Sequence, residues 1–248
     1  MLLEVKNLSI DFGPRRVVDQ VSFSLERGRT LGIVGESGSG KSISSLAIMG
    51  LLPKQAKVSG GSIIFHGYPA EQFYQDKPTK TEPVNLLNLS ERQMRLYRGN
   101  RVSMVFQEPM TSLNPVKKCG HQVVEMLQQH EGISFRKARR RVIELFDEVL
   151  LPRPAKIFDS YPHEISGGQK QRVMIAMALV CNPDLIIADE PTTALDVTVQ
   201  KTILELLRSL QQRHNIGIIF ISHDLGVIAQ IADDVAVMYQ GKVVEQGS

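Results

Sequence analysis

The segment Gly35–Ser42, which reads Gly-Glu-Ser-Gly-Ser-Gly-Lys-Ser, constrains the fold of this 248-residue chain more than any other feature. It directly follows the short apolar run Leu31–Val34 and opens a helical pattern over Lys41–Leu52, which ends before Pro53. A glycine-rich loop between a strand and a helix matches the phosphate-binding loop of nucleotide-binding proteins at every fixed position. We therefore expect an α/β sheet with a nucleoside triphosphate site at the end of one strand.

Each residue type in this loop suits phosphate binding. Glycines let backbone N–H groups approach phosphate oxygens closely, and the following helix presents its positive N-terminal end. Lys41 can reach the β- and γ-phosphates, and the Ser42 hydroxyl can ligate magnesium. The motif alone does not separate a kinase from a GTPase, an ATPase or a translocation motor. The predicted nucleotide contacts are Gly35, Glu36, Ser37, Gly38, Ser39, Gly40, Lys41 and Ser42.

Two adjacent carboxylates form a second candidate site. Asp189 and Glu190 directly follow the apolar run Leu185–Ala188, which is typical of a buried parallel strand. The C-terminal ends of parallel strands face the crevice that binds ligand, so Asp189 is expected to meet the magnesium directly or through water. Glu190 is expected to polarise an attacking water. The alternative is an exposed acidic turn.

The rest of the chain alternates between strand and helix patterns, with strand patterns at both ends. Apolar residues at helical spacing cover residues 121–151 and also 199–210, where Asp196 is a candidate N-terminal cap. Alternating strands and helices predict a parallel sheet, and the terminal strands predict a separate antiparallel portion. The predicted strands are residues 3–6, 8–12, 21–25, 31–34, 62–65 (opened by Ser59-Gly-Gly61), 185–188 and 218–221, and residues 235–245 are a hairpin turning at Gln240-Gly241.

Three other features carry less chemistry. Residues 70–87 are polar and without a clear period, so we interpret them as a surface excursion. The basic run Arg136–Arg141 is typical of a solvated helix face, with a docking face for an acidic partner as the alternative. Cys181 lies in an apolar run and is expected in the core. Cys119 follows two lysines that could lower the pKa of its thiol, but no adjacent histidine–carboxylate pattern supports a reactive role, so we do not expect one. Two cysteines are too few for a disulfide scaffold or a four-ligand zinc site, and they favour a reducing compartment.

Composition and charge exclude several classes of protein. Hydrophobic residues make up 42% and charged residues 22%, which is typical of globular proteins. The net charge of +3 does not indicate a nucleic-acid or anionic-membrane binder. No apolar run approaches the roughly 18–20 residues of a membrane span, and the N-terminus lacks a secretory signal pattern. We expect a cytoplasmic protein that other chains must anchor if it works at a membrane.

Together the motifs resemble the ATPase subunit of an ATP-binding cassette (ABC) transporter, over essentially the whole chain. Ile165-Ser-Gly-Gly-Gln169 resembles the signature sequence of that family, and Thr193-Ala-Leu-Asp196 resembles its loop at the dimer interface. Three single residues match as well: Gln107 resembles the glutamine that joins the two subdomains, His223 the switch histidine, and Phe12 the aromatic residue that stacks on adenine. The motifs occur in the order of the family and with suitable spacing.

The resemblance implies a P-loop NTPase fold, with a RecA-like parallel-sheet core, an N-terminal antiparallel β-subdomain and an inserted helical subdomain that carries the signature sequence. We expect residues 1–248 to form a single ABC ATPase domain. Residues 1–106 and 183–248 would be its core and residues 107–182 its helical subdomain. Two chains would meet head to tail and sandwich two ATP molecules with Mg²⁺.

The resemblance also assigns roles. The catalytic residues would be Glu190, His223, Gln107 and Lys41, and the metal ligands would be Ser42, Gln107 and Asp189. Nucleotide contacts would come from Phe12, the phosphate loop and Asp196, and across the dimer from Ser166, Gly167, Gly168 and Gln169. From the residues alone, Ser166–Gly168 resembles a second anion-binding nest, which is surplus unless it serves a partner's nucleotide. His223 alone would be an ordinary core or surface histidine, and Gln107 an ordinary polar loop residue.

A narrower resemblance, carried by residues 107–115, 172–179 and 189–200, is to the oligopeptide, dipeptide and nickel importer branch. It implies ATP-driven import of a small solute, by default a peptide, with nickel or another solute as the alternative. The implied partners are a second ATPase subunit (identical or a sister chain), two membrane permease subunits and an external solute-binding protein, at the cytoplasmic face of the inner (plasma) membrane. No nucleic acid is expected.

The chain departs from the pattern of the family in four places. Phe12 stands where tyrosine is commoner, and Ile165 replaces the usual leucine. Residues 70–87 are longer than the family norm. The branch normally continues well beyond this point, so we expect Ser248 to be a boundary within a longer protein.

Two alternatives come from other classes of protein. A soluble cassette ATPase of DNA repair, chromosome structure or translation would usually insert coiled coils, zinc modules or basic arms, and the sequence contains none of these patterns. A small-molecule kinase built on the same loop would have no use for Ser166–Gln169 or for Glu190 beside a water.

Overall fold

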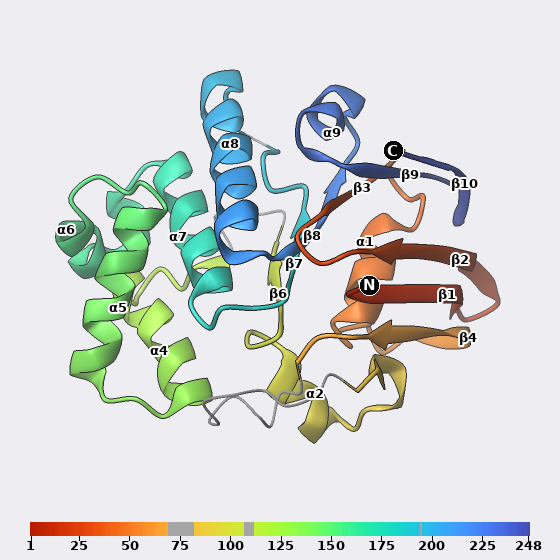
Figure 1. The fold of residues 1–248 in the computed structure, drawn as a ribbon, viewed down its shortest axis with the longest axis horizontal. Coiled ribbons are helices and arrows are strands. Elements are labelled where there is room, and N and C mark those ends of the chain that lie inside the picture. Colours follow the sequence, from red (N-terminus) through yellow and green to blue (C-terminus); the bar gives the residue numbers. More distant parts are fainter. Residues whose placement is uncertain (69–81, 107–111, 194) are drawn as a thin grey trace.

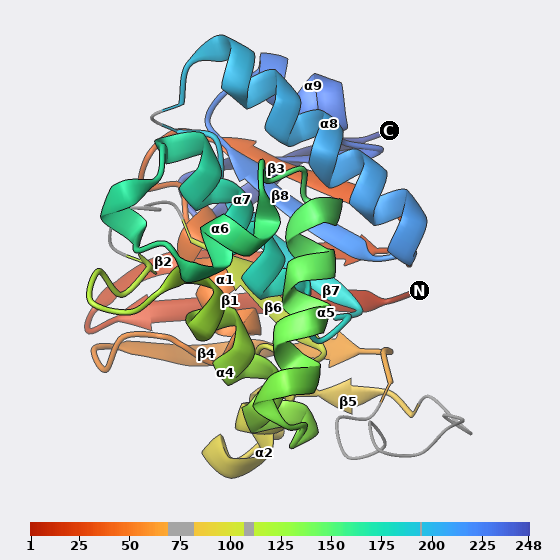
Figure 2. The ribbon, with the colours of Figure 1, turned by 90° about the vertical axis from the view of Figure 1, so that its left-hand side faces the viewer.

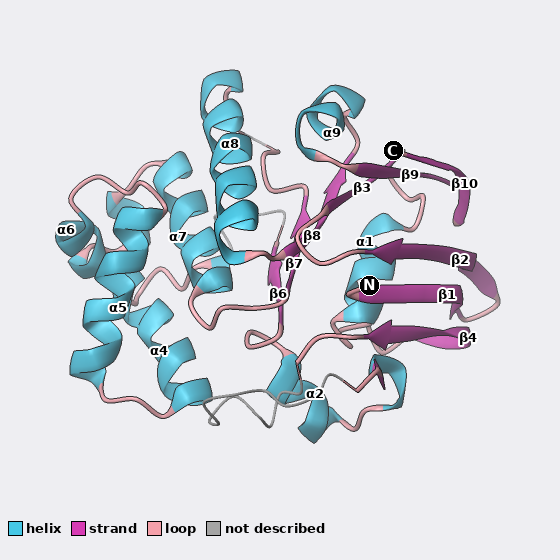
Figure 3. Ribbon diagram, in the orientation of Figure 1, coloured by secondary structure: helices cyan, strands magenta, loops and turns pink. Residues whose placement is uncertain are grey.

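The computed structural model describes residues 1–68, 82–106, 112–193 and 195–248. An antiparallel sheet forms one end of the molecule and a group of helices forms the other (Figure 1); Figure 3 shows the same view with helices in cyan and strands in magenta. Of the sequence predictions, Gln107 lies outside the described residues, as do Ala194 and residues 70–81 of the polar segment.

The antiparallel sheet has the strand order β2-β1-β4-β5 and is formed by β1 (Leu3–Phe12), β2 (Arg15–Leu25), β4 (Ala56–Phe65) and β5 (Val84–Asn85). The predicted strands 3–6 and 8–12 are one strand, which Asn7 (φ 49°) and register shifts interrupt without ending it. Strand β4 begins at Ala56, earlier than predicted, and Gly61 (φ 93°) lies inside it. A Cβ at Gly61 would meet the Asn7 carbonyl oxygen at 2.5 Å, so this bulge requires glycine.

The second sheet has the order β10-β9-β3-β8-β7-β6. All its neighbouring pairs are parallel except β9 and β10. The predictions of a parallel sheet and of a hairpin at Gln240-Gly241 are therefore confirmed. The strands are β3 (Thr30–Gly35), β6 (Val102–Val105), β7 (Leu185–Asp189), β8 (Gly217–Ser222), β9 (Asp234–Tyr239) and β10 (Lys242–Gly247).

The parallel sheet separates two apolar compartments, which explains why its strands are continuous apolar runs. In β7, Ile186 and Ala188 join the compartment on the helical side, whereas Leu185 and Ile187 join the compartment shared with the antiparallel sheet. Successive side chains of a strand point to opposite faces, so both faces of β7 are buried. The one polar residue of this strand, Asp189, therefore lies at its C-terminal end.

The helices are α1 (Lys41–Ile48), α2 (Glu91–Tyr97), α4 (Cys119–Glu131), α5 (Phe135–Glu148), α6 (Pro154–Asp159), α7 (Gly167–Leu179), α8 (Val197–His214) and α9 (Leu225–Ile231), with short 3₁₀ helices η2 (Leu86–Asn88) and η3 (Pro162–Glu164). Helices α4–α7 lie between β6 and β7 in the sequence and form one group in space (Figure 2). Within the described residues, no helix has both the length and the apolar character needed to cross a membrane.

The prediction of one helix over residues 121–151 is wrong. Helix α4 ends at Glu131 and is capped by Gly132, whose left-handed backbone (φ 63°) is common just after a helix, and α5 begins after Ser134. Apolar periodicity overlooked the break because both helices bury their apolar faces in the same compartment. The predicted cap at Asp196 is confirmed, since its Oδ1 accepts the Val199 N–H at 2.9 Å.

The structure bears on three smaller predictions. The described end of the polar segment is not irregular: Asn85 Oδ1 accepts the N–H groups of Ile63 and Leu87, both at 3.2 Å, which ties β5 and η2 to the sheet. Cys119 is fully buried, and burial raises the pKa of its thiol to about 11, so the adjacent lysines do not activate it. In the basic run, Arg136, Lys137 and Arg140 are exposed, as a solvated helix face predicts, whereas Arg141 is 34% exposed and pairs with Glu131 at 2.7 Å.

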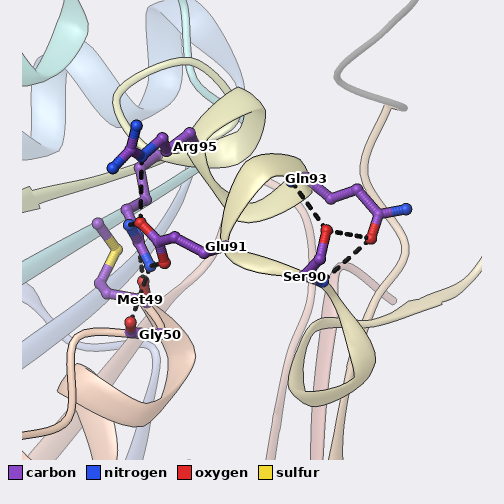
Figure 4. Close-up of polar contacts among 7 residues, drawn as sticks. Met49, Gly50, Ser90, Glu91, Gln93 and Arg95 are labelled. Atoms are coloured by element: carbon purple, nitrogen blue, oxygen red, sulfur yellow. Dashed lines mark hydrogen bonds and ion pairs between the residues drawn. The ribbon is translucent and has the colours of Figure 1, made fainter.

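Arg98 joins the end of α1 to α2. Its guanidinium donates to the carbonyl oxygens of Met49 (2.7 Å) and Gly50 (2.8 Å) and to both carboxylate oxygens of Glu91 (2.8 and 2.9 Å). Figure 4 shows how Met49, Gly50 and Glu91 converge at this point. The hydrogen bond from Arg98 lowers the pKa of Glu91 to about 2, with Arg95 contributing less. The helix that follows the phosphate loop is thus fixed at its far end.

We expect Arg98→Met to lower the free energy of unfolding by about 2 kcal/mol, because two helix-terminal carbonyls lose charged donors in a site where the side chain is 18% exposed. Denaturant unfolding of the purified chain measures this. Arg95→Met is the matched control, since Arg95 is 72% exposed and its pair with Glu91 should contribute less than about 1 kcal/mol. Equal effects of the two substitutions would contradict this role of Arg98.

Candidate functional site

The phosphate loop connects the end of β3 to the start of α1. Gly38 (φ 80°) and Gly40 (φ 102°) adopt left-handed conformations that let the chain curl between the two elements. Lys41 is 5% exposed, and its Nζ donates to the carbonyl oxygens of Gly35 (2.7 Å) and Glu36 (2.9 Å). Burial lowers the pKa of Lys41, while the charges of Glu190 and Asp189 act to raise it. The ammonium group is therefore held inside the loop and close to two carboxylates.

Ser42 and Asp189 form an oxygen pair beside the loop. The Ser42 hydroxyl donates to Asp189 Oδ1 at 3.1 Å, which brings the first turn of α1 against the end of β7. Asp189 is 6% exposed, and burial raises its pKa, although the Ser42 hydrogen bond acts in the other direction. A hydroxyl and a carboxylate oxygen beside a phosphate loop suit Mg²⁺, which prefers one or two protein oxygens together with substrate phosphates. The described residues contain no cluster of three or more histidine, cysteine or acidic side chains suited to a metal ion.

Glu190 and His223 follow the adjacent strands β7 and β8, so the parallel pairing brings them to one edge. The Glu190 N–H donates to the Ile221 carbonyl oxygen at 2.9 Å, and its backbone then turns sharply (φ 46°). His223 Nδ1 lies 3.2 Å from Glu190 Oε1. The carboxylate is 15% exposed and the imidazole 59% exposed, so the imidazole forms the open side of the pair.

The loop and Glu190 border two cavities. A cavity of about 470 Å³ is lined by Phe12, Arg15, Val17 and Glu190 together with the loop residues Ser37, Gly38, Gly40, Lys41 and Ser42. A larger one of about 1040 Å³ is lined by Glu190, Thr193 and His223 together with Gly35, Glu36 and Ser37. Phe12 and His223 thus line different cavities, which share Glu190 and the loop residue Ser37.

Sequence reasoning missed Arg15 and Val17 in the smaller cavity. Arg15 is the partner of Phe12 in the β1–β2 register, across the turn at Gly13-Pro14. A hairpin places residues on either side of its turn opposite each other, so the turn signal next to Phe12 could have identified Arg15. Thr193 was assigned only to the interface loop, although it also lines the larger cavity.

The signature residues lie apart from this site. Ser166 caps α7, because its Oγ accepts the Gln169 N–H at 3.3 Å while Gln169 Oε1 accepts the Ser166 N–H at 3.0 Å. A Cβ at Gly168 would lie 2.9 Å from Val199 Cγ1, whereas a Cβ at Gly167 would meet nothing within 4 Å. The cavities that the phosphate loop lines include no residue of 165–169, nor Asp196. One face of this turn is therefore packed on α8 and the other is open.

Comparison with known proteins identifies the chain. A family model described as ABC transporter matches residues 18–193. The chain belongs to the ABC transporter family. It is 50% identical to the oligopeptide transport ATP-binding protein OppD of Bacillus subtilis and 48% identical to the dipeptide transport ATP-binding protein DppD of Escherichia coli, over 100% and 99% of its length. It spans 66% and 72% of the lengths of these two relatives.

The fold comparison agrees with the family. A dimeric structure of a post-hydrolysis state of an ATP-binding cassette, bound to ADP and Pi, has a TM-score of 0.80 and 26% identity. The alignment covers 100% of this chain and 98% of that one. The predicted α/β fold of an ABC ATPase, with a parallel-sheet core and an antiparallel sheet, is thereby confirmed.

Asp189→Asn should raise the melting temperature near neutral pH in the absence of nucleotide and magnesium. Burial raises the pKa of Asp189 in the folded chain above its value of 3.8 in the unfolded chain. The protonated side chain therefore makes its full contribution to stability below pH 3.8, and this contribution is lost as pH rises through the pKa of the folded state. Above that range the buried carboxylate destabilises the fold, and asparagine removes the charge while keeping an oxygen for Ser42. Thermal unfolding at several pH values should show the difference shrinking toward acid.

Asp196→Asn is the matched control, because asparagine caps a helix as well as aspartate does and Asp196 is exposed. Its melting temperature should follow that of the unmodified chain at every pH. If Asp189→Asn instead melted at a lower temperature near neutral pH, the carboxylate would be net stabilising and this account of its burial would be wrong.

Proposed function

We propose that the chain binds and hydrolyses ATP as the motor subunit of a membrane importer for peptides. The observation that carries the proposal is the edge where β7 and β8 end, since it joins a buried lysine, a hydroxyl, two carboxylates and a histidine around one phosphate loop. The resemblance to oligopeptide and dipeptide transport proteins at 50% and 48% identity supports the choice of cargo.

Different residues of the chain would bind different parts of the nucleotide. Phe12 forms a wall of the 470 Å³ cavity and would stack on adenine, while the loop N–H groups and Lys41 would hold the phosphates. Mg²⁺, when bound by Ser42 and Asp189 with Gln107 as a further ligand, would neutralise charge on the phosphates. Glu190 would orient the attacking water, and the exposed imidazole of His223 would reach the γ-phosphate.

A dimer of two cassettes would give the signature turn, residues 165–169, a role in binding nucleotide. The nest Ser166–Gln169 would bind the nucleotide of a partner subunit, arranged head to tail, because it lies outside the cavities of its own loop and is open at Gly167. Asp196 would contribute at the same interface. The dimeric state of a similar cassette bound to ADP and Pi supports the pairing of two cassettes. ATP would favour association because only the dimer contacts it from both sides.

The subdomain division follows from this arrangement. Residues 1–106 and 183–248 would hold the nucleotide, and residues 107–182 would carry the signature turn to the partner. The further partners would be two membrane permease subunits and an external solute-binding protein, with the cassettes at the cytoplasmic face of the inner (plasma) membrane. Uptake of a labelled dipeptide by the assembled transporter tests the cargo, and ATP-dependent uptake of nickel alone would overturn it.

Glu190→Gln should bind ATP as the unmodified chain does, accumulate as a dimer, and lower turnover by at least about a hundredfold, because the amide cannot accept a proton from water. Phosphate release and size-exclusion chromatography with ATP measure the two effects. Glu125→Gln is the control, since Glu125 lies on α4, is 54% exposed and pairs with Lys117 at the surface. Near-normal turnover of Glu190→Gln would remove Glu190 from the mechanism.

Gly167→Asp should leave the fold intact and abolish ATP-driven dimerisation. A side chain at Gly167 meets open space, and a carboxylate in the first turn of α7 is favoured by the helix dipole. The same charge would repel the phosphates of a partner's nucleotide. Melting temperature and dimer formation separate the two effects.

Gly168→Ala should instead lower the melting temperature, because the new Cβ would collide with Val199 and reduce the free energy of unfolding by about 1–3 kcal/mol. If Gly167→Asp dimerised with ATP as the unmodified chain does, the signature turn would not face a partner's phosphates.

A further inference from the structure

The Glu190 carboxylate is held at both of its oxygens. Oε1 lies 3.2 Å from His223 Nδ1, and Oε2 accepts a hydrogen bond from the Thr193 hydroxyl at 3.0 Å. The last torsion of a glutamate side chain is broad and intrinsically poorly defined, so one contact alone would leave the carboxylate plane free to rotate. The second contact removes that freedom.

The backbone brings Thr193 to this position. The Thr193 N–H donates to the Glu190 carbonyl oxygen at 3.2 Å, which closes a tight turn through Pro191. Glu190 enters the turn with φ 46°, an unusual conformation for a residue with a Cβ, and its N–H is anchored to Ile221. The side chain of residue 193 is thereby directed back to the carboxylate three residues earlier. The turn needs only the backbone of Thr193, whereas the carboxylate contact needs its hydroxyl.

We infer that Thr193 is a positioning residue for ATP hydrolysis, because its hydroxyl orients the Glu190 carboxylate toward the attacking water. This inference rests on the proposed function. Thr193 lines the same 1040 Å³ cavity as Glu190 and His223, so the three side chains meet at one wall. A hydroxyl that donates to one carboxylate oxygen leaves the other lone pairs of the anion available to a water proton. Thr193 itself transfers no proton and touches no reacting atom.

Thr193→Val tests this assignment, because valine keeps the β-branched shape and the backbone turn but has no hydroxyl. Turnover number should fall about tenfold, the effect of losing one hydrogen bond to a charged group, while KM for ATP stays within about twofold. Thr193→Ser should restore turnover to within about threefold of the unmodified chain. Thr202→Val is the control, since the Thr202 hydroxyl bonds only to carbonyls of its own helix, at 2.8 and 3.1 Å.

A double-mutant cycle separates this inference from the proposed function. In single-turnover measurements, Thr193→Val should add less than about twofold to the defect of Glu190→Gln, because it acts through the carboxylate. The inference is overturned if Thr193→Val turns over like Thr202→Val, if Thr193→Ser is as slow as Thr193→Val, or if the two defects multiply. Absence of hydrolysis by the unmodified chain, or normal turnover of Glu190→Gln, would instead overturn the proposed function.

Discussion

Two buried charges of opposite sign organise this molecule. Lys41 and Asp189 are 5% and 6% exposed, and each charge would be costly to bury alone. Burial lowers the pKa of the lysine and raises that of the aspartate, while the attraction between the two charges opposes both shifts. Carbonyl oxygens of the loop around Lys41 and the Ser42 hydroxyl beside Asp189 reduce the remaining cost without removing it. The strand order β3-β8-β7 and the curl of the loop are what keep these partners together.

The sequence predicted the parts of the site that depend on local order. The strand, loop and helix around Gly35–Ser42 are adjacent in the chain, and the acids follow directly on a run that is buried on both faces. A residue that ends one parallel strand must share an edge with the residue that ends the next, so Glu190 and His223 could be brought together without coordinates.

What the sequence could not predict depends on side-chain direction and on distant partners. Arg98 stabilises the end of α1 across 48 residues, and no pattern links the two. The break between α4 and α5 at Gly132 was not predicted, because both helices bury their apolar residues in the same compartment. The thiol of Cys119 was judged from its neighbours in the chain, whereas burial in the apolar compartment on the helical side of the sheet decides its pKa. Gln107 stays a prediction.

The two apolar compartments on either side of the parallel sheet have a mechanical consequence. The β1–β2 hairpin, which carries the Phe12 wall of the nucleotide cavity, packs in one compartment, and α7, which carries the signature turn, packs in the other. A change in the packing of the signature layer would therefore first affect a different apolar compartment from the one behind Phe12. Strand β7, which ends at Asp189, contributes side chains to both compartments, so repacking on either side would reach the edge that holds the carboxylates.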